Sequence, residues 1–329
     1  MLRDFTIMDT MEKITIADSF IKGKNKIGIG HGESKLYIGQ ITDNHTMQFF
    51  DIQKQRGKEF KCFVLKKDLL KYLDDIKVEY FNPTQEYQNK LELPNVWKER
   101  FLKISTLDEV LYFTLKDQDQ LQPPRIYFNT IKKDKNYNLI REVALANISY
   151  ISCLKMQNKH SKEIIYYFRI FADFSYLNFA KEEENILNSI NNNVNIDTQE
   201  KEKISNARIG QGKYREGLLN ECPFCPITMV SDDRLLIASH IKPWRMSDDF
   251  EKTDPKNGFM LAPHIDFLFD RGFISFSDSK QMLLSPWISK LTYKNLGLVE
   301  SKVYPNLAIS GREKYLAFHR ENIFKSYKS

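Results

Sequence analysis

The chain has few cysteines and no long apolar run. Its 329 residues include 4 cysteines, without a spacing typical of a disulfide framework. No stretch approaches the ~20 consecutive apolar residues of a transmembrane helix, and residues 1–13 hold no apolar segment suited to a secretory signal. We therefore expect a cytoplasmic protein with no membrane partner. The abundance of Asn, Lys and Ile suggests a prokaryotic source.

A nucleotide-binding motif is also missing. The one Gly-rich stretch, residues 23–32, lacks the Gly-Lys-Ser/Thr ending of a phosphate-binding loop, and a flexible basic hairpin or a DNA-contacting loop fits it better. There is no internal repeat. The net charge is +6, with 31 basic against 29 acidic residues in 1–203 and 18 against 14 in 204–329. This modest bias toward the C-terminal part suits a polyanionic partner.

The length is sufficient for two domains, each with its own core. Residues 1–180 are predicted to form a β-rich, possibly barrel-like domain, because aromatic and β-branched runs alternate there with turn residues. The expected strands are Lys35–Ile41, Thr46–Ile52, Phe60–Leu65, Glu109–Leu115, Arg125–Ile131, Val143–Leu154 and Ile164–Phe171. A helix is expected at Lys66–Leu73 and a long loop at Asn82–Asn95. Residues 181–203, helical at first and then polar, indicate a linker, so residues 204–329 form the second domain.

The most informative stretch lies in the second domain. Leu235–His240 predicts a short buried strand, and Pro243 then ends the pairing because proline cannot donate to a ladder. A polar acidic loop leads to Asn257-Gly258, a strong turn signal. Phe259–Leu261 is a second short apolar run.

A helix is expected next. Pro263 suits its first turn and Gly272 its C-terminal stop. The helix carries His264, Asp266 and Asp270. The stretch therefore reads strand, loop, strand, helix, with histidine, amide and carboxylate groups on successive elements.

This order resembles the HNH nuclease family, the ββα-metal finger, in the subgroup found in restriction endonucleases. The matching motifs are Ala238-Ser239-His240-Ile241-Lys242-Pro243-Trp244, Asn257-Gly258 and Leu268-Phe269-Asp270-Arg271-Gly272, with Arg208-Ile209-Gly210-Gln211 and Tyr214-Arg215 upstream and Tyr315-Leu316-Ala317-Phe318-His319-Arg320 downstream. The resemblance covers residues 204–327. It implies an α+β chain, in which a β-rich N-terminal domain precedes a ββα-metal HNH nuclease domain.

The resemblance implies that His240 is the general base. A histidine suits this role because its ordinary pKa of ~6.5 leaves much of it neutral at working pH. The alternative is a histidine at a strand end that only bonds a backbone carbonyl. His319, in the downstream motif, is expected to pack on the finger without a catalytic role.

The resemblance also implies one Mg²⁺ or Mn²⁺ ion in each finger. The sequence departs from the family here, because Ser239 stands where most relatives have an aspartate ligand. The third motif position aligns with Asp266, and His264 lies two residues earlier. Positions two apart on a helix are about 200° apart around the axis, so we favour Asp266 as the ligand and keep His264 as the alternative. Asn257 is expected to order the loop or to bind the metal.

Six polar side chains are candidates for DNA contact. Arg208, Gln211 and Arg215 share one face of a helix predicted over Ser205–Asn220, which by resemblance grips the phosphate backbone or braces the finger. The other three flank the expected site: Lys242, Arg245 and Arg271. Solvent-exposed charges are the alternative for all of them.

Cys222 and Cys225 form half of a zinc ribbon. No second cysteine pair follows Asn257, and a closed zinc site needs four ligands. We expect no structural zinc, with Cys225 packed in the turn and Cys222 incidental.

The sequence thus predicts a restriction-type DNA endonuclease whose N-terminal domain reads sequence or modified bases. A single finger cuts one strand, which predicts a homodimer on double-stranded DNA. Two alternatives remain: a DNA-binding protein with an inactive finger, and a nuclease toxin that acts on RNA.

Overall fold

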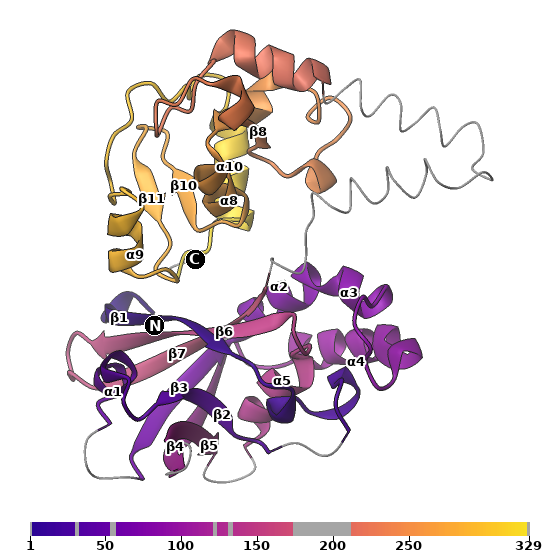
Figure 1. Ribbon diagram of the computed structural model, residues 1–329, viewed down its shortest axis with the longest axis vertical. Coiled ribbons are helices and arrows are strands. Elements are labelled where there is room, and N and C mark those ends of the chain that lie inside the picture. The colour runs from indigo at the N-terminus through magenta and orange to yellow at the C-terminus, as the bar shows by residue number, and fades with distance from the viewer. Residues whose placement is uncertain are drawn as a thin grey trace. The chain divides into compact units, whose positions relative to one another are not determined.

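The computed structural model describes residues 2–29, 33–52, 57–120, 124–130, 134–173 and 212–327. The chain divides into two compact units, residues 1–178 and 179–329, and each is described by itself (Figure 1). The linker predicted at 181–203 lies outside the described residues. Among the described helices, none is both long and apolar enough to cross a membrane.

The N-terminal unit is built on a curled seven-stranded sheet (Figure 1). Its strand order is β1-β6-β7-β3-β4-β5-β2, and all neighbours are antiparallel except β3 and β7. The strands are β1 (Phe5–Thr15), β2 (Leu36–Gln40), β3 (Glu59–Leu65), β4 (Val110–Gln120), β5 (Arg125–Thr130), β6 (Ser149–Asn158) and β7 (Ile164–Ala172). The predicted β-rich fold of this part is therefore confirmed.

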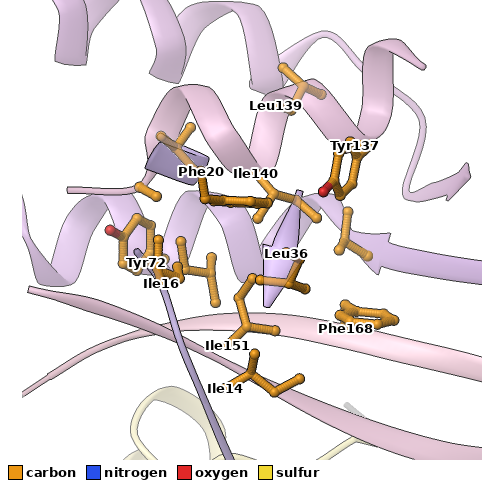
Figure 2. Close-up of a cluster of buried hydrophobic side chains, with 14 of the residues drawn as sticks. Ile14, Ile16, Phe20, Leu36, Tyr72, Tyr137, Leu139, Ile140, Ile151 and Phe168 are labelled. Atoms are coloured by element: carbon orange, nitrogen blue, oxygen red, sulfur yellow. The ribbon is translucent and has the colours of Figure 1, made fainter. Parts of the chain in front are cut away.

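Within the described part of this unit, five α-helices accompany the sheet: α1 (Asn44–Phe49), α2 (Lys66–Asp75), α3 (Lys77–Phe81), α4 (Leu93–Ser105) and α5 (Lys135–Val143), with short 3-10 turns at Leu2–Asp4, Asp18–Phe20, Gly23–Asn25 and Lys90–Glu92. The core lies between the sheet and the helices. Figure 2 shows Phe20, Tyr137 and Ile140 packed above Ile151 and Ile14 of the sheet. Long aliphatic and aromatic side chains from both layers exclude water there, which is the main stabilising contribution in such a fold.

Three sequence predictions for this unit were wrong, and one strand was not predicted at all. The strand expected at Thr46–Ile52 is helix α1, because the Asp43 side chain caps its first turn at the amides of His45 and Thr46. The end of the loop expected at Asn82–Asn95 is the start of α4. Strand β1 was missed. The strand expected from Val143 begins only at Ser149, since Val143 still belongs to α5.

The C-terminal unit begins, among the described residues, with a helix over residues 212–221. Its strands are β8 (Ile237–His240), β9 (Gly258–Leu261), β10 (Ile274–Phe276) and β11 (Met282–Leu284), and its helices are α8 (Pro263–Asp270), α9 (Lys290–Asn295) and α10 (Glu313–Asn322), with 3-10 turns at Asp233–Leu235, Trp244–Met246 and Pro255–Asn257. β8 pairs antiparallel with β9, and β10 with β11.

The ββα hook consists of β8, β9 and α8. Pro263 occupies the first turn of α8, and Gly272 follows the helix with φ +68°, a conformation that favours glycine. Gly258 does not form the tight turn expected from Asn257-Gly258. It is extended, with φ −167°, and begins β9 opposite His240. Glycine is needed here because a side chain at this position would collide with the hydroxyl of Tyr214.

Candidate active site

His240 lies at the end of β8, and its imidazole has one fixed and one available nitrogen. Nε2 lies 3.0 Å from the backbone oxygen of Lys252. A carbonyl can only accept, so Nε2 carries the proton and the neutral ring keeps Nδ1 as its acceptor. No hydrogen-bond partner meets Nδ1 within the described parts of the chain. The ring is therefore oriented as a proton acceptor.

Two aromatic side chains enclose this imidazole. The ring of Tyr214 stacks on it with a centroid distance of 4.0 Å and an interplanar angle of 10°. Trp244 meets it edge-on at 5.5 Å. Burial among these groups lowers the pKa of His240 below its ordinary value, against the opposing effects of the Lys252 carbonyl and the Asp270 carboxylate. His240 is therefore held neutral, as a base at neutral pH requires.

Asp266, on α8, faces the preceding residue of β8. Its carboxylate is hydrogen-bonded by the Ser239 side chain, which is itself buried. Burial raises the pKa of Asp266 to about 6, and the nearby Asp270 charge adds to this, whereas Ser239 and Arg271 oppose it. Asp270 thus acts on both Asp266 and His240. The carboxylates of Asp266 and Asp270 on α8 and the imidazole of His240 on β8 therefore form one electrostatic cluster.

The chemistry of these donors fits a hard divalent cation. Two neighbouring carboxylates, Asp266 and Asp270, repel each other when ionised, and a bound cation would remove this repulsion. Carboxylate oxygens are the ligands that Mg²⁺ and Mn²⁺ prefer, and a site with few protein ligands leaves room for water and phosphate. Within the described residues no group of three His, Cys, Asp or Glu side chains is arranged to hold a metal. His264 is exposed on α8, away from the buried face that carries Ile265 and Leu268.

Asn257 is fully buried and organises the loop between the two strands. Its Oδ1 accepts from the amide of Lys242 at 2.8 Å. Its Nδ2 lies 3.0 Å from the backbone oxygen of Glu251 and 3.2 Å from Ser247 Oγ. The side-chain amide of Asn257 is thus engaged in hydrogen bonds inside the loop.

Of the six residues predicted to contact DNA, the structure describes four. Arg208 and Gln211 lie outside the described residues. Arg215 donates to the backbone oxygens of Leu236 and Asp233 at 2.9 and 2.6 Å. Arg215 therefore braces the entry to β8.

The three basic residues that flank the site also differ. Lys242 is ion-paired with Glu251 in the loop. Arg271 lies 3.6 Å from the Asp270 carboxylate and over the ring of Phe267. Arg245 is exposed, and its side chain is the most open of the three toward solvent.

Two residues outside the hook complete the site and had no role assigned from the sequence. Tyr214 stacks on the imidazole of His240. Arg312, only 1% exposed, donates to the backbone oxygen of Gly258 at 2.9 Å and pairs with Glu221 at 2.7 Å. Tyr214 stood in an upstream motif, so its proximity could have been suspected. Nothing in the pattern around Arg312 distinguishes it from a surface arginine.

The cysteines of the expected half-ribbon lie just before the hook. Cys225 is fully buried, and the thiol of Cys222 lies 3.4 Å from the backbone oxygen of Phe224. Burial raises the pKa of the Cys222 thiol. A protonated thiol is a poor metal ligand.

An antiparallel strand pair with a histidine at its end, packed under a short acidic helix, is the ββα finger of nucleases. Residues 225–277 match a family model described as HNH endonuclease. This match agrees with the HNH resemblance predicted from the sequence and supports a nuclease domain over these residues. A comparison with curated proteins gives no significant match.

Proposed function

We propose that the protein is a restriction-type endonuclease that hydrolyses phosphodiester bonds of double-stranded DNA, with His240 as the general base. The observation that carries this proposal is the state of the imidazole. Nε2 is committed to a carbonyl, Nδ1 is available, and burial keeps the ring neutral. A histidine that served only to fix the strand end would not need an available second nitrogen.

Nδ1 of His240 accepts a proton from a water molecule as the water oxygen attacks phosphorus. The bond from phosphorus to the 3′ oxygen breaks, and that oxygen leaves with the electron pair. A general base of this kind contributes on the order of 10²–10⁴ in rate.

Asp266 is the residue that we propose as the metal ligand, with Asp270 beside it. A divalent cation, which HNH nucleases generally use, would stabilise the charge on the phosphate and on the leaving oxygen. The raised pKa of Asp266 supports this assignment, because a carboxylate kept in an unfavourable environment gains most from a bound cation. Asn257 orders the loop that supplies the Lys252 carbonyl. His264, which is exposed on α8, is the less favoured candidate for the metal ligand.

The curled N-terminal sheet is proposed to read sequence or modified bases, and two copies of the chain to act on the two strands. The seven-stranded sheet offers a continuous surface on which DNA could bind. The C-terminal part carries the larger share of the positive charge, which suits contact of the nuclease domain with phosphates. Arg245, exposed beside the site, is the flanking cation most suited to phosphate contact. A cytoplasmic location in a prokaryote fits this role.

The test is digestion of methylated and unmethylated phage DNA, plasmid and RNA by the purified protein with Mg²⁺ or Mn²⁺. Cleavage of DNA that requires the metal and disappears in His240→Ala is expected. His264→Ala is the matched control and should retain most of the activity. Cleavage of RNA alone would favour the toxin, and DNA binding without cleavage would favour an inactive finger.

A further inference from the structure

We propose that Tyr214 is the positioning residue for His240, supplied by a helix that lies outside the family match. This inference rests on the proposed role of His240 as the base. Tyr214 belongs to the helix over residues 212–221, whereas the matched segment begins at residue 225. The finger thus depends on a preceding element for the orientation of its catalytic histidine.

The ring of Tyr214 fixes the plane of the imidazole. At 4.0 Å and 10° the two rings are in parallel contact, so the imidazole cannot rotate about its ring bond without losing that contact. The Lys252 carbonyl fixes the rotation in the same sense through Nε2. Together the two contacts select one tautomer and one direction for Nδ1.

We call the ring of Tyr214 and the helix that carries it the platform. The hydroxyl of Tyr214 connects this platform to the ββα hook. It donates to the backbone oxygen of Asn257 at 3.0 Å and lies 3.3 Å from that of Ser239. These carbonyls belong to the two strands' adjoining ends, next to His240 and Gly258. A Cβ on Gly258 would lie only 1.8 Å from the phenol oxygen. Glycine at this position therefore provides the space for Tyr214.

The helix that carries Tyr214 is itself fastened at two points. Arg215 donates to the backbone oxygens of Leu236 and Asp233. At the other end Glu221 pairs with Arg312, which also donates to Gly258. The platform therefore cannot shift as a whole without breaking charge-assisted hydrogen bonds.

The platform has two effects on the base. It covers one face of the imidazole, and burial is the largest cause of the lowered pKa of His240. It also presents a π face to the ring as the ring gains a proton, which favours the developing imidazolium. Orientation is the larger effect on rate, because a misplacement of about 1 Å can cost on the order of 10²-fold.

Two substitutions of Tyr214 separate the ring from the hydroxyl. Tyr214→Phe keeps the stack and should cleave within about threefold of the wild type. Tyr214→Leu removes it, and kcat should fall on the order of 10–100-fold with KM little changed. The acid limb of the pH–rate profile should move up toward the ordinary histidine pKa, as water reaches the uncovered face.

Tyr293→Leu is the matched control. Tyr293 is also buried and its hydroxyl also donates to two backbone oxygens, those of Phe273 and Ser285, at 2.7 and 3.0 Å. These two oxygens lie just before β10 and just after β11, not at the ends of β8 and β9 where His240 lies. This variant should lose stability to a similar extent and leave kcat per folded molecule and the acid limb unchanged.

Imidazole ¹⁵N chemical shifts give a readout that does not need activity. The neutral His240 should be the Nε2–H tautomer in the wild type and in Tyr214→Phe, and a mixture in Tyr214→Leu. If folded Tyr214→Leu keeps both the tautomer and the wild-type kcat, the inference is wrong. If the wild type cleaves no nucleic acid but the tautomer changes as described, the proposed function fails and the positioning role stands.

Discussion

Two histidines of the C-terminal unit occupy nearly the same surroundings and differ at one nitrogen. His240 stacks on Tyr214 at 4.0 Å, and His319 stacks on Phe269 at 4.1 Å. In each, Nε2 lies 3.0 Å from a backbone oxygen, that of Lys252 or of Phe269. The Nδ1 of His319, however, is bonded to Ser275 Oγ at 2.9 Å, and the side chain is 1% exposed.

This difference shows what separates a histidine that holds a fold from one suited to chemistry. Aromatic stacking and a carbonyl partner orient either ring equally well. His319 has both nitrogens engaged and no access to solvent, so it cannot accept a proton from water. His240 remains partly exposed, and its Nδ1 is the nitrogen still able to accept. The comparison makes each histidine the control for the other.

The largest expected effect comes from removing each imidazole in turn. His240→Ala should reduce the cleavage rate on the order of 10²–10⁴-fold with little change in Tm, because the ring is a minor part of the core. His319→Ala should do the reverse, lowering Tm while the residual folded enzyme cleaves DNA normally. Cleavage assays and thermal melts of both variants make the measurement. A His240→Ala enzyme with full activity would end the comparison.

Lowering the pH should destabilise the folded protein through the buried imidazole of His319. Burial lowers the pKa of His319 to about 4, so between that value and the unfolded pKa of 6.5 the unfolded chain binds more protons. Stability must therefore fall as the pH drops through this window. The two pKa values correspond to about 3 kcal/mol. Urea unfolding at pH 7 and pH 4 measures the loss, and His319→Gln should reduce it. An equal loss in the variant would assign the effect to other groups.

The carboxyl of Asp266 should make the stability depend on pH in the opposite direction. Burial raises its pKa from 3.8 to about 6, so between these values the folded chain binds more protons and stability falls as the pH rises. Above pH 6 the ionised carboxylate is a destabilising group, by about 1–2 kcal/mol after allowance for its partial exposure. Asp266→Asn should therefore raise the Tm of the metal-free protein at pH 7.

Metal addition completes this test. Mg²⁺ or Mn²⁺ should raise the Tm of the wild type at pH 7 and do so less at pH 5, where the carboxyl is protonated. The shift should be small in Asp266→Asn and preserved in His264→Ala. A shift lost instead with His264 would move the metal ligand to that residue.

The sequence was most informative where short motifs and spacing decide the structure. β8, β9 and α8 lie within one or two residues of their expected positions, because Pro263 and Gly272 mark the helix ends. The strand expected at Thr46–Ile52 failed, since a side-chain cap at Asp43 outweighed the β propensity of its aromatic residues.

The geometry of long-range contacts was beyond the reach of sequence patterns, even where a motif such as Tyr214-Arg215 hinted at proximity. The stack of Tyr214 on His240 joins residues 26 positions apart by their numbers, and the bond from Arg312 to Gly258 joins residues 54 apart. Neither follows from periodicity or propensity, which describe neighbours along the chain. Gly258 shows the same limit, because it suggested a turn and instead, at the start of β9, makes room for the phenol of Tyr214.

The smallest expected effect tests whether an available nitrogen is sufficient by itself. Ser275→Ala removes the partner of the His319 Nδ1 and should cost about 1 kcal/mol, measured by urea unfolding at pH 7. It should not restore any cleavage in a His240→Ala background, because the ring of His319 stays buried away from water. Recovery of cleavage in the double variant would show that stacking and one unpaired nitrogen alone make a base. Its absence, with the stability loss observed, assigns the remaining requirement to the opening of His240 toward solvent and to the carboxylates beside it.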